Sequence, residues 1–510
     1  MSEVSNSKRI AKNTLMLYFR QILIMLVSLY TVRVVLEVLG AEDYGIYNVV
    51  AGVVTMFSFL SGAMATASQR YFSFDLGKKD YEQLRKTFGV SFTIYVLLAL
   101  VVVLLAETVG LWFVYNKLVI PPERVQAARW IYQASIVSFV FTILTTPYMA
   151  SIIAHEDMTI YAYVSIVEVI LKLGIVFLLP LFSLDKLMLY GLLMAVVVII
   201  NTTVYRTICR RKYEECRAKR QWDTALFKEL LSYTGWNMFG ASVGVFKFQA
   251  VNIVLNQFFN PVVIAARGIA SQVNGAVNSF AQNFSTAVRP QIIKNYAAGK
   301  KEEMYELVYK SCKGTFFLMY IFTLPLCLEM PFVLKLWLKN PPEHAVLFTQ
   351  LALIDVLIDS INYPLMTAAQ ATGKIKLYQS VVGGVLLLNF PLAFLFYSLG
   401  FPPVTVFYIS IGITLTAGIV RIYILKRLLG FSISNFMSKV YLPLLLSVIF
   451  SLILPFLLYF FINYGITRFF LISISSLLCS GFGFYSLSLS KKERKWFNSM
   501  LISKIRKNNA

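Results

Sequence analysis

The chain consists of apolar blocks of about twenty residues, separated by short polar or charged segments. A helix rises about 1.5 Å per residue, so a block of this length crosses the hydrocarbon core of a bilayer, which is about 30 Å thick. The pattern predicts an all-α polytopic membrane protein with fourteen transmembrane helices. We place these spans at 13–37, 44–69, 87–115, 128–152, 159–181, 186–208, 231–258, 262–287, 314–338, 345–370, 376–399, 403–425, 440–462 and 468–489.

Composition agrees with this class and argues against a soluble protein. Hydrophobic residues make up 58% of the 510 positions and charged residues only 14%, whereas a soluble protein carries roughly 25% charged residues. The mean hydropathy is +0.69. The polar, basic segment 2–12 lacks a signal-peptide cleavage pattern, so we expect the first span to be retained.

The net charge of +22 is unevenly distributed along the chain. If the N-terminus is cytoplasmic, most Lys and Arg residues fall in cytoplasmic segments, above all in 206–228, 289–313 and 491–507. This asymmetry is the positive-inside pattern, and it predicts that both termini face the cytoplasm. Basic segments of this kind contact anionic lipid, so we expect membrane lipid, and no nucleic acid, as their partner.

The two halves of the chain resemble each other at an offset of about 220 residues. Pro121-Pro122-Glu123 recurs as Pro341-Pro342-Glu343, and Gly77-Lys78-Lys79 recurs as Gly299-Lys300-Lys301. Two further pairs follow in the same order, namely Pro147-Tyr148-Met149 with Pro364-Leu365-Met366, and Tyr161 with Tyr378. Their common order and offset predict an internal duplication.

The duplication predicts a domain plan of two parallel repeats with six helices each. An even number of spans returns the chain to its starting side, so both repeats insert the same way up, as in parallel-repeat transporters. We expect an N-terminal lobe at 1–208, a basic linker at 209–230, a C-terminal lobe at 231–430, and two additional helices with a basic tail at 431–510. Such lobes leave a cleft between them that can open to either side of the membrane.

Polar residues form stripes on single faces of the second and eighth spans. The eighth span carries Arg267, Ser271, Asn274, Asn278, Gln282 and Ser285. The second span carries Asn48, Thr55, Gly62, Thr66 and Gln69. Two interpretations remain open for both stripes and for Asn252 of the seventh span. The side chains line a wet, sugar-contacting cleft, or they bond neighbouring helices to each other.

Basic residues within the predicted spans include Arg20, Arg33, Lys172, Lys247 and Arg267. Lys172 follows Glu168 by four residues, so an intrahelical ion pair is expected there, and Arg33 has the same relation to Glu37. Arg20, Lys247 and Arg267 have no acidic residue within one helical turn along the sequence. A cation at the centre of a span costs about 2.5–3.5 kcal/mol. An anionic ligand such as phosphate would compensate this cost, and we take Arg20, Arg33, Lys247 and Arg267 as candidate phosphate ligands.

Asp355 and Asp359 share one face of the tenth span and have two possible roles. They carry a coupling ion, or they neutralise an arginine of another helix. The five cysteines and two histidines, His155 and His344, show no metal-ligand spacing, and no nucleotide or zinc motif occurs. We therefore expect a protein without a metal or cofactor that is not an enzyme.

Three segments resemble the polysaccharide-transporter branch of the multidrug/oligosaccharidyl-lipid/polysaccharide exporter superfamily. They are Leu39-Gly40-Ala41-Glu42-Asp43-Tyr44-Gly45 before the second span, Ser68-Gln69-Arg70-Tyr71 at its end, and Ala369-Gln370-Ala371-Thr372-Gly373-Lys374 after the tenth. With the plan of six, six and two spans, the resemblance covers nearly the whole chain. It implies the V-shaped exporter fold of bacterial O-antigen and capsule flippases.

The resemblance also implies a function. Such proteins move an undecaprenyl-pyrophosphate-linked oligosaccharide, a repeat unit of O-antigen, lipopolysaccharide or capsule, across the bacterial inner membrane by alternating access. The lipid-linked oligosaccharide is the expected substrate, and a polysaccharide polymerase with chain-length machinery the expected partner. Two alternatives stay open, a multidrug exporter of organic cations with the same fold and a peptidoglycan-precursor flippase.

Overall fold

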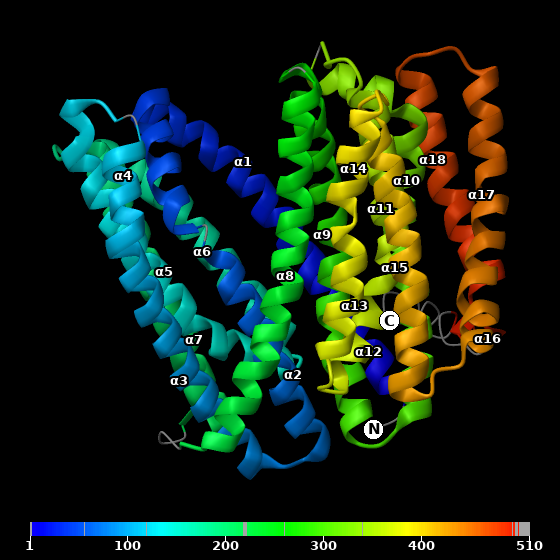
Figure 1. The fold of residues 1–510 in the computed structure, drawn as a ribbon, viewed down its shortest axis with the longest axis horizontal. Coiled ribbons are helices and arrows are strands. Elements are labelled where there is room, and N and C mark those ends of the chain that lie inside the picture. The colour runs from blue at the N-terminus through cyan, green and yellow to red at the C-terminus, as the bar shows by residue number, and fades with distance from the viewer. Residues whose placement is uncertain are drawn as a thin grey trace, which may run out of the picture. The chain divides into compact units, whose positions relative to one another are not determined.

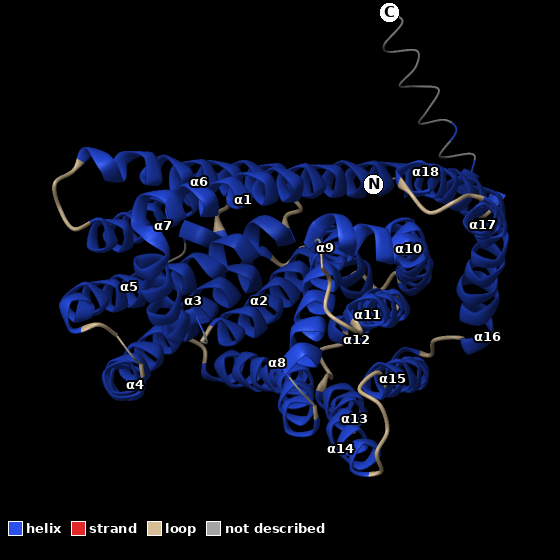
Figure 2. Ribbon diagram, turned by 90° about the horizontal axis from the view of Figure 1, so that it is seen from above, coloured by secondary structure: helices blue, strands red, loops and turns tan. Residues whose placement is uncertain are grey.

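The computed structural model describes residues 3–55, 57–118, 120–217, 222–259, 261–338, 340–491, 493–494 and 498, and gives only the backbone for some of them. Figure 2 shows helices and loops, and no strand occurs in this part of the chain. The all-α class is therefore confirmed. Eleven of the described helical segments are long and apolar enough to cross a membrane. The predicted spans 44–69, 231–258 and 262–287 are not among these eleven, but they are largely helical over their described residues.

The chain divides into two compact units. The N-terminal unit comprises Arg9–Ala241 together with Tyr296–Ala298. In Figure 1 its helices run from blue through cyan to green. It contains most of α1 (Glu3–Thr55), then α2 (Ser58–Lys78), α3 (Tyr81–Leu105), α4 (Leu111–Lys117), α5 (Val125–Ala154), α6 (Met158–Leu178), α7 (Lys186–Lys212) and the first half of α8 (Thr224–Phe258).

The C-terminal unit comprises Ser242–Asn295 and Gly299–Ala510, with Met1–Lys8. It begins inside α8, so a single helix passes from one unit into the other. Its other helices are α9 (Pro261–Ala297), α10 (Lys301–Leu338), α11 (Ala345–Ser360), α12 (Asn362–Ala371), α13 (Lys376–Leu387), α14 (Asn389–Ser398), α15 (Thr405–Leu429), α16 (Ile433–Phe436), α17 (Leu442–Phe461) and α18 (Ile466–Gly483).

The first two predicted spans correspond to two helical segments of α1 that meet at Gly40, where the backbone is not helical. Helix α1 continues from Glu3 to Thr55 and changes direction at Gly40, whose φ of 81° lies in the left-handed region. Glycine adopts this conformation at little cost because it has no Cβ atom. Gly40 therefore separates the first two predicted spans, and it belongs to the family-like segment that precedes the second span.

Proline divides two other predicted spans into pairs of short helices. Pro364 and Pro391 each stand three residues into a new helix, α12 and α14. A proline has no N–H to donate to the carbonyl four residues earlier. Those carbonyls belong to Ser360 and Leu387, the residues at which α11 and α13 end. Each break thus lies at the carbonyl to which the proline cannot donate.

The last two long helices are bound to the C-terminal unit by buried ion pairs on α10. Arg468 of α18 lies 2.7 Å from Glu329, and their side chains are 9% and 0% exposed. Lys313 lies 3.1 Å from Glu493 and donates to the carbonyl of Ser488 over 2.8 Å. The hairpin of α17 and α18 is therefore an integral part of this unit.

Candidate functional site

Arg20 of α1 lies against α6 in the N-terminal unit. Its guanidinium donates to the Ser165 hydroxyl over 3.4 Å and stacks over the Tyr161 ring at 4.5 Å from the ring centroid. Stacking on an aromatic face stabilises a cation in a partly dry environment. Arg20 is half-buried, so the apolar helices hold its charge while part of the side chain stays accessible.

The two predicted intrahelical ion pairs are confirmed. Lys172 lies 2.6 Å from Glu168, whose other oxygen accepts a hydrogen bond of 2.8 Å from Asn201 of α7. Arg33 lies 3.5 Å from Glu37, but the two side chains are 77% and 65% exposed. An exposed pair of this kind contributes little stability.

Lys247 of α8 and Asp355 of α11 come together although the sequence places them more than a hundred residues apart. The Lys247 ammonium lies 4.0 Å from Asp355 Oδ2, and both side chains are half-buried, at 23% and 21% exposure. The same carboxylate oxygen accepts a hydrogen bond of 2.8 Å from Ser410 of α15. A predicted cation and a predicted acid thus form one cluster inside the C-terminal unit.

Asp359 stands one helical turn after Asp355 and has a different partner. It accepts from Arg421 of α15 over 3.2 Å and from Asn362 over 2.9 Å. Arg421 also donates to the Tyr378 hydroxyl over 3.1 Å. Asp359 therefore neutralises an arginine of another helix, which is one of the two roles considered for it.

Sequence reasoning did not single out Arg421. The residue lies near the end of the predicted span 403–425, where a basic residue is usually an anchor at the membrane surface. Its burial to 7% exposure becomes visible only in the folded unit. The sequence match between Tyr161 and Tyr378 could have pointed to Arg421. Tyr161 lies against Arg20 in one repeat, and Tyr378 lies against Arg421 in the other.

The polar stripe of α9 makes hydrogen bonds within its own unit. Asn274 donates to the carbonyl of Ala352 on α11 over 3.0 Å. Asn278 accepts from the Tyr363 hydroxyl on α12 over 2.8 Å. These two asparagines thus bond neighbouring helices, while Gln282 is exposed. Arg267, at the other end of the stripe, is only 9% exposed.

The other candidate residues of the polar stripes differ in exposure. Asn48 is exposed and donates to Tyr44 O in its own helix over 2.9 Å. Thr66 donates to Gly62 O over 3.2 Å. Gln69 is 9% exposed and Asn252 is half-buried. The side chain of Thr55 lies outside the described residues.

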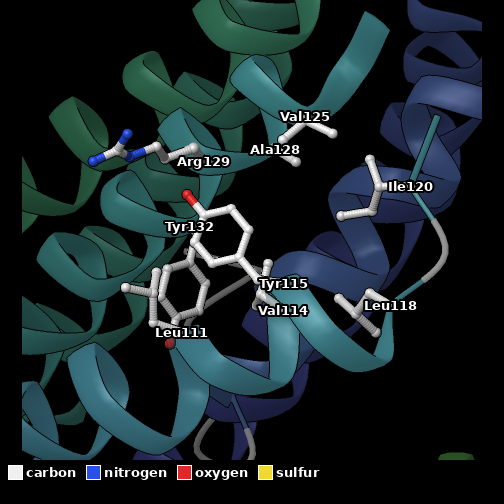
Figure 3. A pocket seen from close by; sticks show the side chains of 9 residues that line it. All are labelled: Leu111, Val114, Tyr115, Leu118, Ile120, Val125, Ala128, Arg129 and Tyr132. Atoms are coloured by element: carbon white, nitrogen blue, oxygen red, sulfur yellow. The ribbon is translucent and has the colours of Figure 1, made fainter. Parts of the chain in front are cut away.

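A separate pocket lies where α4 and the loop after it meet the start of α5 (Figure 3). None of the candidate site residues lines it. Its lining is mostly apolar, with one basic and two tyrosine side chains: Leu111, Val114, Tyr115, Leu118, Ile120, Val125, Ala128, Arg129 and Tyr132. This lining contains neither a carboxylate nor a thiol.

Within the described residues, no group of three or more His, Cys, Asp or Glu side chains could hold a metal ion. The charged clusters inside the helices instead pair one cation with one carboxylate. The pair of Lys247 and Asp355 and the pair of Arg421 and Asp359 are examples.

Two parts of the chain match known protein families. Residues 10–296, more than half of the chain, match the family described as polysaccharide biosynthesis protein. Residues 238–395 match the family described as MatE. None of the curated proteins matches the chain.

Several solved structures have the same fold. An outward-facing multidrug resistance MATE family transporter of the MOP superfamily has a TM-score of 0.68 and 12% identity, covering 82% of this chain and 96% of its own. A point mutant of the Vibrio cholerae MATE transporter VcmN has a TM-score of 0.65 and 15% identity, and the match covers 83% of this chain and 98% of that one. A MOP superfamily transporter from Pyrococcus furiosus has a TM-score of 0.65 and 12% identity, and the match covers 81% of this chain and 94% of that one. At these identities the likeness concerns the fold.

Proposed function

Because the chain belongs to the polysaccharide biosynthesis protein family, we propose that this membrane transporter is a flippase for an undecaprenyl-pyrophosphate-linked oligosaccharide. It moves the lipid from the cytoplasmic to the outer leaflet of a bacterial inner membrane, with both chain ends in the cytoplasm. The observation that carries the proposal is this family match over residues 10–296. Cations held among apolar helices in both units support it.

The proposed ligand for these cations is the pyrophosphate. Arg20 and Lys247 are the first candidates because each is partly exposed and each lies inside an apolar helix. Phosphate oxygens accept charge-assisted hydrogen bonds from guanidinium and ammonium groups. Half-buried Asn and Gln side chains would bind sugar hydroxyls. The prenyl chain would remain in lipid.

A multidrug exporter is the second candidate, because residues 238–395 match MatE and multidrug transporters share the fold. Charge argues against it at Arg20, whose guanidinium would repel a cationic drug. For the Pyrococcus furiosus transporter, a reversed polarity of the binding pocket is stated to suggest a different function. The polarity of the intramembrane residues is therefore the relevant discriminator here too.

A transport assay with purified protein tests the proposal. The full chain is reconstituted in vesicles that contain an undecaprenyl-pyrophosphate-linked oligosaccharide with a fluorescent label on its sugar. We expect the protein to increase the rate at which the label crosses to the other leaflet, as read by a membrane-impermeant quencher. A labelled phosphatidylglycerol serves as the control and should not move faster.

Three outcomes separate the candidates. Movement of the labelled oligosaccharide lipid supports the proposal. Movement of a labelled peptidoglycan precursor alone would assign the protein to the other class of lipid flippase. Uptake of ethidium without movement of either lipid would contradict the flippase proposal and favour the multidrug exporter.

A further inference from the structure

The C-terminal unit contains two acid–base pairs on one face of α11, and they are built differently. Asp355 and Asp359 are four residues apart, so both side chains lie on one side of the helix. Each faces a cation of another helix, Lys247 for Asp355 and Arg421 for Asp359. The two pairs differ in the distance between their charged atoms, 4.0 Å for Lys247 and Asp355 and 3.2 Å for Arg421 and Asp359.

The pair of Asp359 and Arg421 is tightly held. Arg421 lies 3.2 Å from Asp359, and the side chains of the two residues are 8% and 35% exposed. Tyr378 and Asn362 provide further hydrogen bonds, of 3.1 Å to the guanidinium and 2.9 Å to the carboxylate. A fixed guanidinium with several partners is a structural element of the bundle.

The pair of Asp355 and Lys247 is loosely held. The charged atoms are 4.0 Å apart, beyond the usual length of a hydrogen bond. Asp355 Oδ2 is oriented by Ser410, whereas Asp355 Oδ1 is buried and makes no hydrogen bond. The carboxylate is therefore positioned beside the ammonium without being fully satisfied by it.

These features match what a replaceable anion requires. Carboxylate and phosphate oxygens are the same class of acceptor for an ammonium group. Lys247 carries its charge on a flexible stem, so its ammonium can turn from one acceptor to another. A phosphate with more oxygens and more charge would compete successfully against a carboxylate at 4.0 Å.

We infer that Asp355 is an internal substitute for the substrate phosphate, which holds Lys247 in the empty transporter and is displaced when the pyrophosphate binds. This inference rests on the proposed flippase function. Its physical basis is the cost of an uncompensated cation among apolar helices. During the return step of the cycle, the empty protein carries the neutral pair of Lys247 and Asp355. During the outward step, the bound pyrophosphate takes the place of Asp355 as the partner of Lys247.

The inference predicts opposite effects of one substitution on binding and on turnover. Asp355→Asn removes the competing charge but keeps the shape and a hydrogen bond with Ser410. Undecaprenyl pyrophosphate should then bind more tightly, by up to about fivefold, since an exposed ion pair is worth at most about that factor. Repeated transport should become slower, because Lys247 has no partner during the empty return.

Asp359→Asn is the matched control. It removes the same charge one helical turn away, but from a pair that the bundle holds in place. It should lower the thermal stability and leave the affinity for undecaprenyl pyrophosphate unimproved. Lys247→Gln should weaken binding, and in that background Asp355→Asn should no longer increase the affinity.

The experiment measures binding of undecaprenyl pyrophosphate to the full chain in nanodiscs, and transport in vesicles. Tighter binding with slower steady transport in Asp355→Asn supports the inference. Unchanged or weaker binding in a variant that melts like the wild type would overturn it. If the wild type neither binds undecaprenyl pyrophosphate nor moves the labelled lipid, the proposed function itself has failed.

A second measurement needs no variant. A hydrophobic carbodiimide couples a carboxylate to an adjacent amine, so it should link Asp355 to Lys247 in the empty wild-type protein. Mass spectrometry detects the cross-linked peptides. Undecaprenyl pyrophosphate should suppress the link several-fold, and a link that forms equally in its presence would show that the pair is not displaced.

Discussion

The guanidinium of Arg421 is neutralised by Asp359, so removal of one partner leaves a charge inside the bundle. Loss of one member of a buried ion pair costs about 3–5 kcal/mol. Since Asp359 is 35% exposed, we expect Arg421→Leu to destabilise the protein by the lower end of that range. The measurement is the thermal midpoint of the purified protein in detergent.

The double variant Arg421→Leu/Asp359→Leu provides the control for this prediction. An apolar pair of similar volume leaves no charge behind and should recover most of the lost stability. A double variant that is as unstable as Arg421→Leu would show that packing of the arginine stem, and not its charge, stabilises the site.

Asp75 provides a second test at the residue scale and lies beyond the predicted end of the second span. Burial raises the pKa of its carboxyl to about 6, although Thr87 donates to it over 2.7 Å. The folded protein therefore binds this proton more tightly than the unfolded chain. Stability from this group is complete at about pH 4 and falls as the pH rises through about 6, by about 1.4 kcal/mol for each unit of the shift.

Asp75→Asn should remove this dependence because the amide does not ionise. We expect the difference in thermal midpoint between the variant and the wild type to change in favour of the variant as the pH rises from about 4 to about 7. A difference that is constant over this range would contradict a raised pKa for Asp75.

At the scale of an element, Tyr132 of α5 packs closely against the segment that follows α3. The π-helical segment Ala106–Gly110 follows α3, and Tyr132 of α5 donates to the carbonyl of Ala106 over 2.6 Å. A Cβ atom on Gly110 would lie 2.2 Å from the Tyr132 hydroxyl. Gly110 is thus required by the packing of α5 against this segment.

Gly110→Ala should therefore destabilise the N-terminal unit, with a cost typical of overpacking, about 1–3 kcal/mol. Tyr132→Phe removes the oxygen that collides, so the double variant should be more stable than Gly110→Ala alone. Thermal midpoints of the two single variants and the double variant give the coupling directly. Purely additive effects would exclude the proposed collision.

Features that lie within one helix could be predicted from the sequence, and contacts between helices could not. Apolar blocks predicted all the long helices, and Pro364 and Pro391 explain two breaks within predicted spans. The break at Gly40 lies between the first two predicted spans. Lys172 with Glu168 was predictable since both lie on one helix. Lys247 with Asp355 was not, because separate helices contribute them.

At the scale of the whole molecule, the last hairpin is joined to α10 by buried ion pairs. Residues 1–430 and 431–510, expressed as two chains, should therefore associate in the membrane and purify together. Glu329→Arg places a second cation beside Arg468, at a site where both native side chains are at most 9% exposed. We expect this substitution to abolish co-purification.

Glu306→Arg is the matched control for this prediction. Glu306 also lies on α10 and pairs with Lys439 over 2.6 Å, but the two side chains are 43% and 50% exposed. Exposed pairs contribute about 0–1 kcal/mol, so the two chains should still purify together. Loss of association in both variants would show that any charge reversal on α10 is damaging, regardless of burial.

The sequence by itself determined the membrane class, the helices and their approximate limits, and the presence of cations within apolar segments. These properties depend on local hydrophobicity and on the backbone chemistry of proline and glycine, which a single segment contains in full. It also contained the family-like motifs.

Only the tertiary structure decided which charge meets which. Arg421 became a partner of Asp359, Asn274 and Asn278 became links between helices, and Lys247 met Asp355 at a distance that leaves the pair loose. The reason is physical: the energy of a charge inside a membrane protein depends on neighbours from other helices. Packing brings those neighbours together, and no spacing along one helix can specify them.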